Sequence, residues 1–242
     1  MIEDRPSPNF NDRTRPVSML VLHYTGMDDA ESAIERLRDP NAGVSAHYVV
    51  AEDGSVSRLV AEDKRAWHAG AGAWRGETDV NSASIGVEIV NGGHCYGLPD
   101  FPDAQIGAVI ALAQGVLQRW DIKPSGVLGH SDLAPERKLD PGERFRWREL
   151  AAAGVGVWPT NVTGDQTVRH GPGRGSGETL ARLQERLRAI GYAEPGEGEY
   201  APRTRAVVAA FQRRFRASRV DGLIDGETAN LIEAVATLTQ RA

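Results

Sequence analysis

The 242-residue sequence contains a single cysteine, Cys95. One cysteine cannot form an intrachain disulfide, and it excludes the paired-cysteine motifs of redox proteins and sulfur-rich metal sites. Any metal ion in this protein must therefore be held by histidine, aspartate or glutamate side chains.

Long apolar runs are also absent. No segment approaches the roughly 20 apolar residues that a transmembrane helix requires. The N-terminal stretch MIEDRPSPNFNDRTRP has acidic residues and prolines, but it lacks the apolar core of a signal peptide. We therefore expect no transmembrane segment and a cytoplasmic location, with the periplasm or cell envelope as the alternative.

Basic residues are not concentrated in any one block. The chain has 28 lysines and arginines against 33 acidic residues, for a formal net charge of -5. Without a basic patch to follow a phosphate backbone, we expect no nucleic acid partner. The contents of 40% hydrophobic and 25% charged residues are those of an ordinary folded domain. The oligomeric state stays open.

Strand-like and helix-like segments alternate in the first two thirds of the chain. Helical spacing of apolar residues appears in DDAESAIERLR and FPDAQIGAVIALAQGVLQRW. Strands interleaved with helices predict a layered α/β domain. The expected strands are the β-branched runs at residues 17–24, 45–51, 84–90 and 126–130.

Two histidines follow short apolar segments that we predict to be strands. His23 ends VSMLVLH, His130 ends GVLGH, and Asp140 follows ten residues after His130. A lone histidine after an apolar strand is more often a core or capping residue than a ligand. Two of them at strand ends, however, lie where α/β folds commonly place their sites. Two histidines and an aspartate with one open position suit catalytic zinc, so we predict one zinc ion.

The segment GHSDLAPERKLDPG, residues 129–142, is too rich in proline for a continuous helix or strand. One interpretation is a solvated loop with incidental charges, and the other is a functional site. Lys138, two residues before Asp140, is either a cation beside a metal or a surface charge. Pro141 and Gly142 predict a turn directly after the aspartate.

Glu88 lies in the predicted strand SIGVEIV, on the same face as Ser84 and Gly86. These small residues leave room beside the carboxylate. A carboxylate between Val87 and Ile89 is costly to bury without a partner. The pattern therefore indicates either a catalytic task or a structural salt bridge.

Five segments in this order, VLHYTG, SAHYVV, RAWHAG, SIGVEIVN and GHSDLAPERKLDPG, resemble the zinc-dependent N-acetylmuramoyl-L-alanine amidases of type 2, the AmpD- and AmiD-like family. The resemblance implies a mixed central β-sheet flanked by helices, a fold shared with peptidoglycan recognition proteins. It also implies that His23, His130 and Asp140 bind zinc. Glu88 then corresponds to the general base, and Lys138 to the lysine that stabilises the reacting carbonyl.

Three further residues fall where this family lines its substrate cleft. We expect His47, Trp67 and His68 to contact the substrate or the metal ligands, with structural hydrogen bonds as the alternative for the two histidines. Trp74 is another candidate for the cleft wall, although a tryptophan is more often core. Glu136 stands where many relatives have glycine, so we expect a different rim and specificity rather than a lost ligand.

The C-terminal segment resembles the three-helix peptidoglycan-binding domain, with the motifs FQRRF and DGLIDGET. We expect it to be a non-catalytic anchor with a small core of its own, which adds polymer affinity and nothing to the chemical step. The resulting division is a zinc amidase domain at 15–158, a linker at 159–176 and a peptidoglycan-binding domain at 177–242.

Two functions fit these features. The first is a zinc amidase that cleaves the bond between the lactyl group of muramic acid and L-alanine; the second is a wall-recognition protein that binds muropeptides without cleaving them. The complete set of ligands and catalytic groups favours the enzyme. The expected partners are peptidoglycan or muropeptides. The missing signal segment favours soluble anhydro-muropeptides as substrates, whereas the appended domain favours the polymer.

Overall fold

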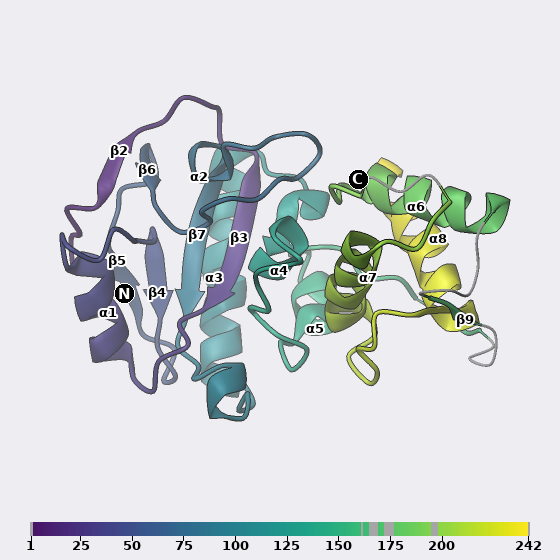
Figure 1. Cartoon of the computed structure of the whole chain (residues 1–242). Helices are drawn as coiled ribbons and strands as arrows, with labels where there is room; N and C mark the ends of the chain where they lie inside the picture. Colours follow the sequence, from purple (N-terminus) through teal and green to yellow (C-terminus); the bar gives the residue numbers. More distant parts are fainter. Residues whose placement is uncertain (1, 161, 165–168, 172–176, 195–197, 242) are drawn as a thin grey trace.

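The computed structural model describes residues 2–160, 162–164, 169–171, 177–194 and 198–241. Its central sheet has the strand order β1-β5-β4-β7-β3-β8. Figure 1 labels four of these strands, β5, β4, β7 and β3. Only one pair of neighbouring strands, β4 and β5, is antiparallel, so the predicted mixed sheet is confirmed. The strands are β1 (Ile2–Asp4), β3 (Met19–Tyr24), β4 (Tyr48–Val50), β5 (Val56–Arg58), β7 (Ser84–Ile89) and β8 (Val127–Gly129).

Both faces of β3 are covered, which explains its almost continuous apolar sequence. Leu20 and Leu22 pack in one cluster with the apolar stripe of α3 (Asp103–Trp120). Met19 and Val21 alternate with them and belong to a second cluster on the other face. The helix predicted from the apolar spacing of residues 101–120 is therefore confirmed.

The remaining elements form no part of this sheet. Two small antiparallel ribbons, β2 with β6 and β9 with β10, lie outside it. No helix in the described part of the chain has the length and apolar character to cross a membrane. The other elements are β2 (Phe10–Asp12), α1 (Ala30–Arg38), β6 (Lys64–Ala66), α2 (Val80–Ala83), η1 (His94–Tyr96), η2 (Pro124–Gly126), α4 (His130–Leu133), α5 (Trp147–Ala152), β9 (Arg169–His170), α6 (Glu178–Ile190), α7 (Pro202–Phe215), β10 (Ile224–Asp225) and α8 (Gly226–Arg241).

The first twelve residues contain two strands that the sequence pattern did not indicate. β1 pairs in parallel with β5, and β2 pairs with β6. All residues of these two strands are exposed, so they lack the apolar alternation by which strands are predicted. The folded sheet domain therefore begins before residue 15, the boundary that the sequence suggested.

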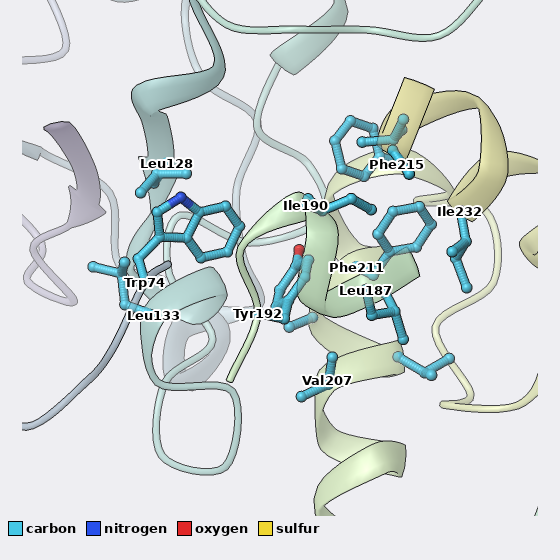
Figure 2. Packing of buried hydrophobic residues seen from close by; sticks show 14 of the residues in the cluster. Trp74, Leu128, Leu133, Leu187, Ile190, Tyr192, Val207, Phe211, Phe215 and Ile232 are labelled. Carbon is cyan, nitrogen blue, oxygen red and sulfur yellow. The ribbon is translucent and has the colours of Figure 1, made fainter. Parts of the chain in front are cut away.

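The three helices expected after residue 177 are present as α6, α7 and α8, but they share their core with the sheet domain. Their apolar residues form one cluster with Trp74, Leu128 and Leu133 (Figure 2). The prediction of a small core confined to these helices is therefore wrong. The predicted linker at 159–176 lies partly outside the described residues, and its described part includes β9.

Candidate metal centre and active site

Three neighbouring parallel strands bring the predicted site residues to one edge of the sheet. His23, near the end of β3, lies opposite Glu88 of β7 in the strand register. His130 follows β8 directly and begins α4. Asp140 returns from the loop after α4, and its carbonyl oxygen accepts a 2.9 Å hydrogen bond from the Ser131 amide. The carboxyl ends of the strands therefore assemble the site, as is usual in α/β folds.

Three potential ligand atoms converge at this edge. The Nδ1 atoms of His23 and His130 lie 2.9 Å apart, and each lies 3.0 Å from Oδ2 of Asp140. All three side chains are buried. The ligands of a tetrahedral zinc ion, bound at about 2.0–2.2 Å, lie roughly 3.3 Å from one another. A small outward movement would therefore fit this group to zinc.

A backbone carbonyl sets the tautomer of His130. Its Nε2 atom lies 2.8 Å from the carbonyl oxygen of Ala69. A carbonyl oxygen can only accept, so Nε2 carries a proton and the neutral ring presents a lone pair at Nδ1. This outer hydrogen bond prepares a histidine for metal binding.

A chain of side chains sets the tautomer of His23 in the same way. The Ser84 hydroxyl donates to the Val80 carbonyl oxygen at 2.5 Å, so its oxygen is free to accept from Nε2 of His68 at 3.2 Å. Nδ1 of His68 is then an acceptor, and it lies 3.0 Å from Nε2 of His23. The proton of His23 therefore resides on Nε2, and its Nδ1 lone pair faces His130 and Asp140.

The electrostatics of the group favour a neutral His23 and an ionised Asp140. Burial, with His130 close by, lowers the pKa of His23 to about 4, so its ring is neutral at pH 7. Burial alone would raise the pKa of Asp140, but the neighbouring His130 and His23 hold it well below its ordinary value. A neutral His23 and an ionised Asp140 thus offer an imidazole nitrogen and a carboxylate oxygen to a cation, next to the Nδ1 atom of His130.

The position of His68 depends on a glycine in β7. A Cβ atom at Gly86 would lie 2.4 Å from Cγ of His68. The room that the small residues leave on this face of the strand is therefore occupied by the His68 ring. His68 contacts the metal-binding group through His23, and it also lines the adjoining cavity.

Glu88 stands beside this group. Its Oε2 atom is buried and has no hydrogen-bond partner, which gives no support to a structural salt bridge. Burial raises the pKa of Glu88 well above its ordinary value; the charge of Asp140 adds to this effect, and Lys138 opposes it. A buried carboxyl group whose protonated form is favoured in this way is a candidate for proton transfer.

A cavity of about 390 Å³ opens over these residues. Glu88, Lys138, Trp67 and the three potential ligands line it, together with Arg36 and Arg137. Arg137 also fixes the loop, because its Nη2 atom donates to the carbonyl oxygens of Ala69 at 2.8 Å and Ala71 at 2.5 Å. Neither arginine was indicated by the sequence pattern, and Arg36 on α1 carries no local signal that distinguishes it from other surface arginines.

Two other predicted cleft residues have different positions. His47 is fully buried and does not line the cavity. Its Nδ1 atom accepts a 2.9 Å hydrogen bond from the Gly86 amide, and its Nε2 atom lies 3.0 Å from the Lys64 carbonyl oxygen. These are structural hydrogen bonds, so its position does not support a substrate contact. Trp74 is core rather than cleft wall, because its ring packs edge-on against Tyr192 at 4.9 Å.

Known proteins resemble this chain over most of its length, in both the sheet domain and the C-terminal helices. Residues 13–143 match the N-acetylmuramoyl-L-alanine amidase family, and residues 176–232 match the putative peptidoglycan binding domain. The N-acetylmuramoyl-L-alanine amidase AmiD of Escherichia coli (strain K12) is 39% identical over 238 residues, which cover 90% of this chain and 82% of AmiD.

Two solved structures resemble both the sheet domain and the helices. The complex of AmiD from E. coli with the substrate anhydro-N-acetylmuramic acid-L-Ala-D-gamma-Glu-L-Lys has a TM-score of 0.77 and 37% identity, covering 94% of this chain and 92% of that one. AmpDH3 from Pseudomonas aeruginosa with an anhydromuramic pentapeptide has a TM-score of 0.74 and 33% identity, covering 91% of each chain. The chain therefore belongs to the N-acetylmuramoyl-L-alanine amidase family, and it is an enzyme of this class with an added peptidoglycan-binding domain.

Proposed function

We propose that this enzyme uses one zinc ion, held by His23, His130 and Asp140, to hydrolyse the amide bond between a muramic acid lactyl group and L-alanine. The observation that carries the proposal is the arrangement of the three converging acceptor atoms next to Glu88 in one cavity. Glu88 is the only catalytic carboxyl group that the proposal requires.

The donor set favours zinc over the common hard cations. Magnesium and calcium prefer all-oxygen ligands, whereas zinc takes imidazole nitrogen together with carboxylate oxygen. Three protein ligands leave one position open. When bound in such a site, zinc lowers the pKa of a water molecule to about 7 and polarises a carbonyl group as a Lewis acid.

Glu88 is proposed to transfer the proton. Its carboxylate accepts one proton from the attacking water, and the oxygen of that water forms the new bond to the lactyl carbonyl carbon. The same carboxyl group then gives the proton to the alanine nitrogen as the carbon–nitrogen bond breaks. Burial supports both steps, because it raises the pKa of Glu88 and allows the group to hold the proton between them.

Lys138 is proposed to stabilise the negative charge that develops on the carbonyl oxygen. It lines the cavity, and it is close enough to Glu88 to oppose the rise in the pKa of that carboxyl group. Its backbone amide donates to the Ala134 carbonyl oxygen at 2.9 Å, so the turn that carries it is ordered.

We propose anhydro-muramyl peptides as the substrates of this cavity, since AmiD and AmpDH3 were solved with ligands of this kind. The test is to incubate the zinc-loaded protein with anhydro-N-acetylmuramic acid-L-Ala-D-gamma-Glu-L-Lys and to identify the products by mass spectrometry. We expect the anhydro sugar acid and the free peptide, which together contain one added water. Asp140→Ala is the matched control and should leave the substrate intact. Intact substrate with both proteins would refute the proposed reaction.

A further inference from the structure

Asp132, two residues after His130, is a buried carboxylate with partners from distant parts of the chain. Its side chain is 1% exposed. One oxygen, Oδ2, accepts from the Gly129 amide at 2.9 Å and from Nη1 of Arg214 at 2.9 Å. The other, Oδ1, accepts from the Tyr192 hydroxyl at 2.6 Å. Both side-chain partners belong to the C-terminal helical region.

These two partners are themselves held in place. Tyr192 is 3% exposed, and its ring packs between Trp74 of the sheet domain and Phe211 of α7 (Figure 2). The Arg214 guanidinium, also buried, lies 4.2 Å from the centre of the Trp147 ring, at cation–π distance. The contact between the two domains therefore includes a desolvated ionic group and not apolar packing alone.

A buried ion pair is weak as a source of stability, because desolvation of the two charges offsets much of their attraction. A buried ion pair can instead hold two segments in one geometry. Here the pair of Asp132 and Arg214 holds the segment that supplies two of the potential metal ligands. Asp132 holds the Gly129 amide, which immediately precedes His130. The Ser131 amide in turn donates to the carbonyl oxygen of Asp140.

A second contact links the same loop to the C-terminal helices. Nη1 of Arg203, in α7, lies 2.5 Å from Oε2 of Glu136. Glu136 lies in the loop between the two potential ligands His130 and Asp140. Both contacts join α7 to the segment between His130 and Asp140.

We infer that the C-terminal helices are a positioning element of the active site: Arg214 and Tyr192, acting through Asp132, set the location of the ligands His130 and Asp140. This inference rests on the proposed metal site. The peptidoglycan-binding domain then has a role besides any anchoring, since the ligand atoms lie about 3 Å from one another and a small shift of α4 separates them.

The test compares two buried arginines of the full-length protein. Arg214→Met removes the ionic partner of Asp132. Arg216→Met is the matched control, because Arg216 is equally buried and pairs at 2.5 Å with Asp225 inside the C-terminal region, where it does not contact α4. Tyr192→Phe is a milder variant that removes one hydrogen bond and keeps the ring. The readouts are hydrogen exchange of the amides at 129–133 and zinc affinity by competition with a chromophoric chelator.

We expect Arg214→Met to speed amide exchange at 129–133 and to weaken zinc binding by about 10-fold to 100-fold, the range typical of lost outer contacts of metal ligands. Tyr192→Phe should act in the same direction with smaller effect. Arg216→Met should lower the melting temperature but leave both readouts near those of the unaltered protein. Equal effects of the two arginine variants, or none for Arg214→Met, would overturn the inference. If the unaltered protein binds no zinc, the proposed function fails, and amide exchange still decides the positioning role.

Discussion

The Nδ1 atoms of His23 and His130 face each other at 2.9 Å, although each ring uses its other nitrogen as a hydrogen-bond donor. Neutral imidazoles in these tautomers present lone pairs to each other and to the Asp140 carboxylate. A bound cation would relieve the resulting repulsion. The outer hydrogen bonds that set the tautomers can therefore be tested together with the proposed ligands.

Replacement of His68 by alanine should weaken zinc binding by roughly 10-fold to 100-fold, because His23 then loses the acceptor that keeps its proton on Nε2. Equilibrium zinc titration against a competing chelator measures this change. His47→Ala is a matched control, since His47 is also a buried histidine but its hydrogen-bond partners are backbone groups and Arg13 rather than a proposed metal ligand. Zinc affinity reduced equally in both variants would show that the effect is general destabilisation and not tautomer control.

Glu88→Ala should keep zinc and substrate affinity and lose about 100-fold to 10,000-fold in turnover, as expected for a positioned general base. Steady-state kinetics and zinc titration on the same preparation separate the two effects. If the variant loses the metal, or turns over at a rate close to that of the unaltered enzyme, Glu88 is not the proton-transfer group.

The raised pKa of Glu88 predicts a pH-dependent gain in stability for Glu88→Gln in the metal-free protein. The folded chain holds this proton more tightly than the unfolded chain, so the contribution of Glu88 to stability is lost as pH rises above the ordinary carboxyl pKa. A glutamine side chain cannot ionise. The melting temperature of the Glu88→Gln protein should therefore exceed that of the unaltered protein at pH 7, with a difference that shrinks toward pH 4.

Glu62→Gln is the opposite-sign control for that experiment. Burial alone would raise the pKa of Glu62, but hydrogen bonds from Arg119, Trp120 and Tyr48 outweigh it and lower the pKa. Its ionised form thus stabilises the fold above the ordinary carboxyl pKa, and that contribution is lost as pH falls. Glu62→Gln should melt lower than the unaltered protein at pH 7. Shifts of the same sign for both variants would contradict the assigned environments.

A chain that ends at Thr160 should melt at a lower temperature and cleave soluble anhydro-muramyl peptide more slowly than the full chain. Truncation exposes Trp74 and Leu133 and removes both side-chain partners of Asp132. This outcome differs from the expectation for a separate anchor, which affects polymer capture alone. An unchanged melting temperature and an unchanged rate on the soluble peptide would restore the anchor interpretation.

The sequence predicted the sheet and the group of residues that could hold a metal because their signals are local. Apolar strands ending in His23 and His130 place both imidazoles at the carboxyl edge, and Asp140 follows within the same loop. Glu88 was recognisable as a carboxylate in a strand of small and apolar residues. These features depend on alternation and spacing, which a linear pattern contains.

The contacts between distant segments could not be predicted in this way. Asp132 lies 82 residues from Arg214 and 60 from Tyr192, and nothing near either partner indicates a buried acceptor. Trp74 was a candidate for the cleft wall, although a tryptophan is more often core, and only its packing with the C-terminal helices identifies it as core. His47 and His68 occur in similar local patterns, but only His68 reaches a metal ligand.

The metal dependence of the reaction is tested most simply by measuring the rate of lactyl–alanine cleavage as zinc is returned to the metal-free enzyme. Cleavage of the soluble anhydro-muramyl peptide should be abolished by chelation and should rise in proportion to added zinc, reaching its full value at one equivalent per chain. The His23→Ala variant should not recover under the same titration. Full activity in a preparation shown to be free of metal would contradict the proposal that the His23, His130 and Asp140 group works by binding a metal ion.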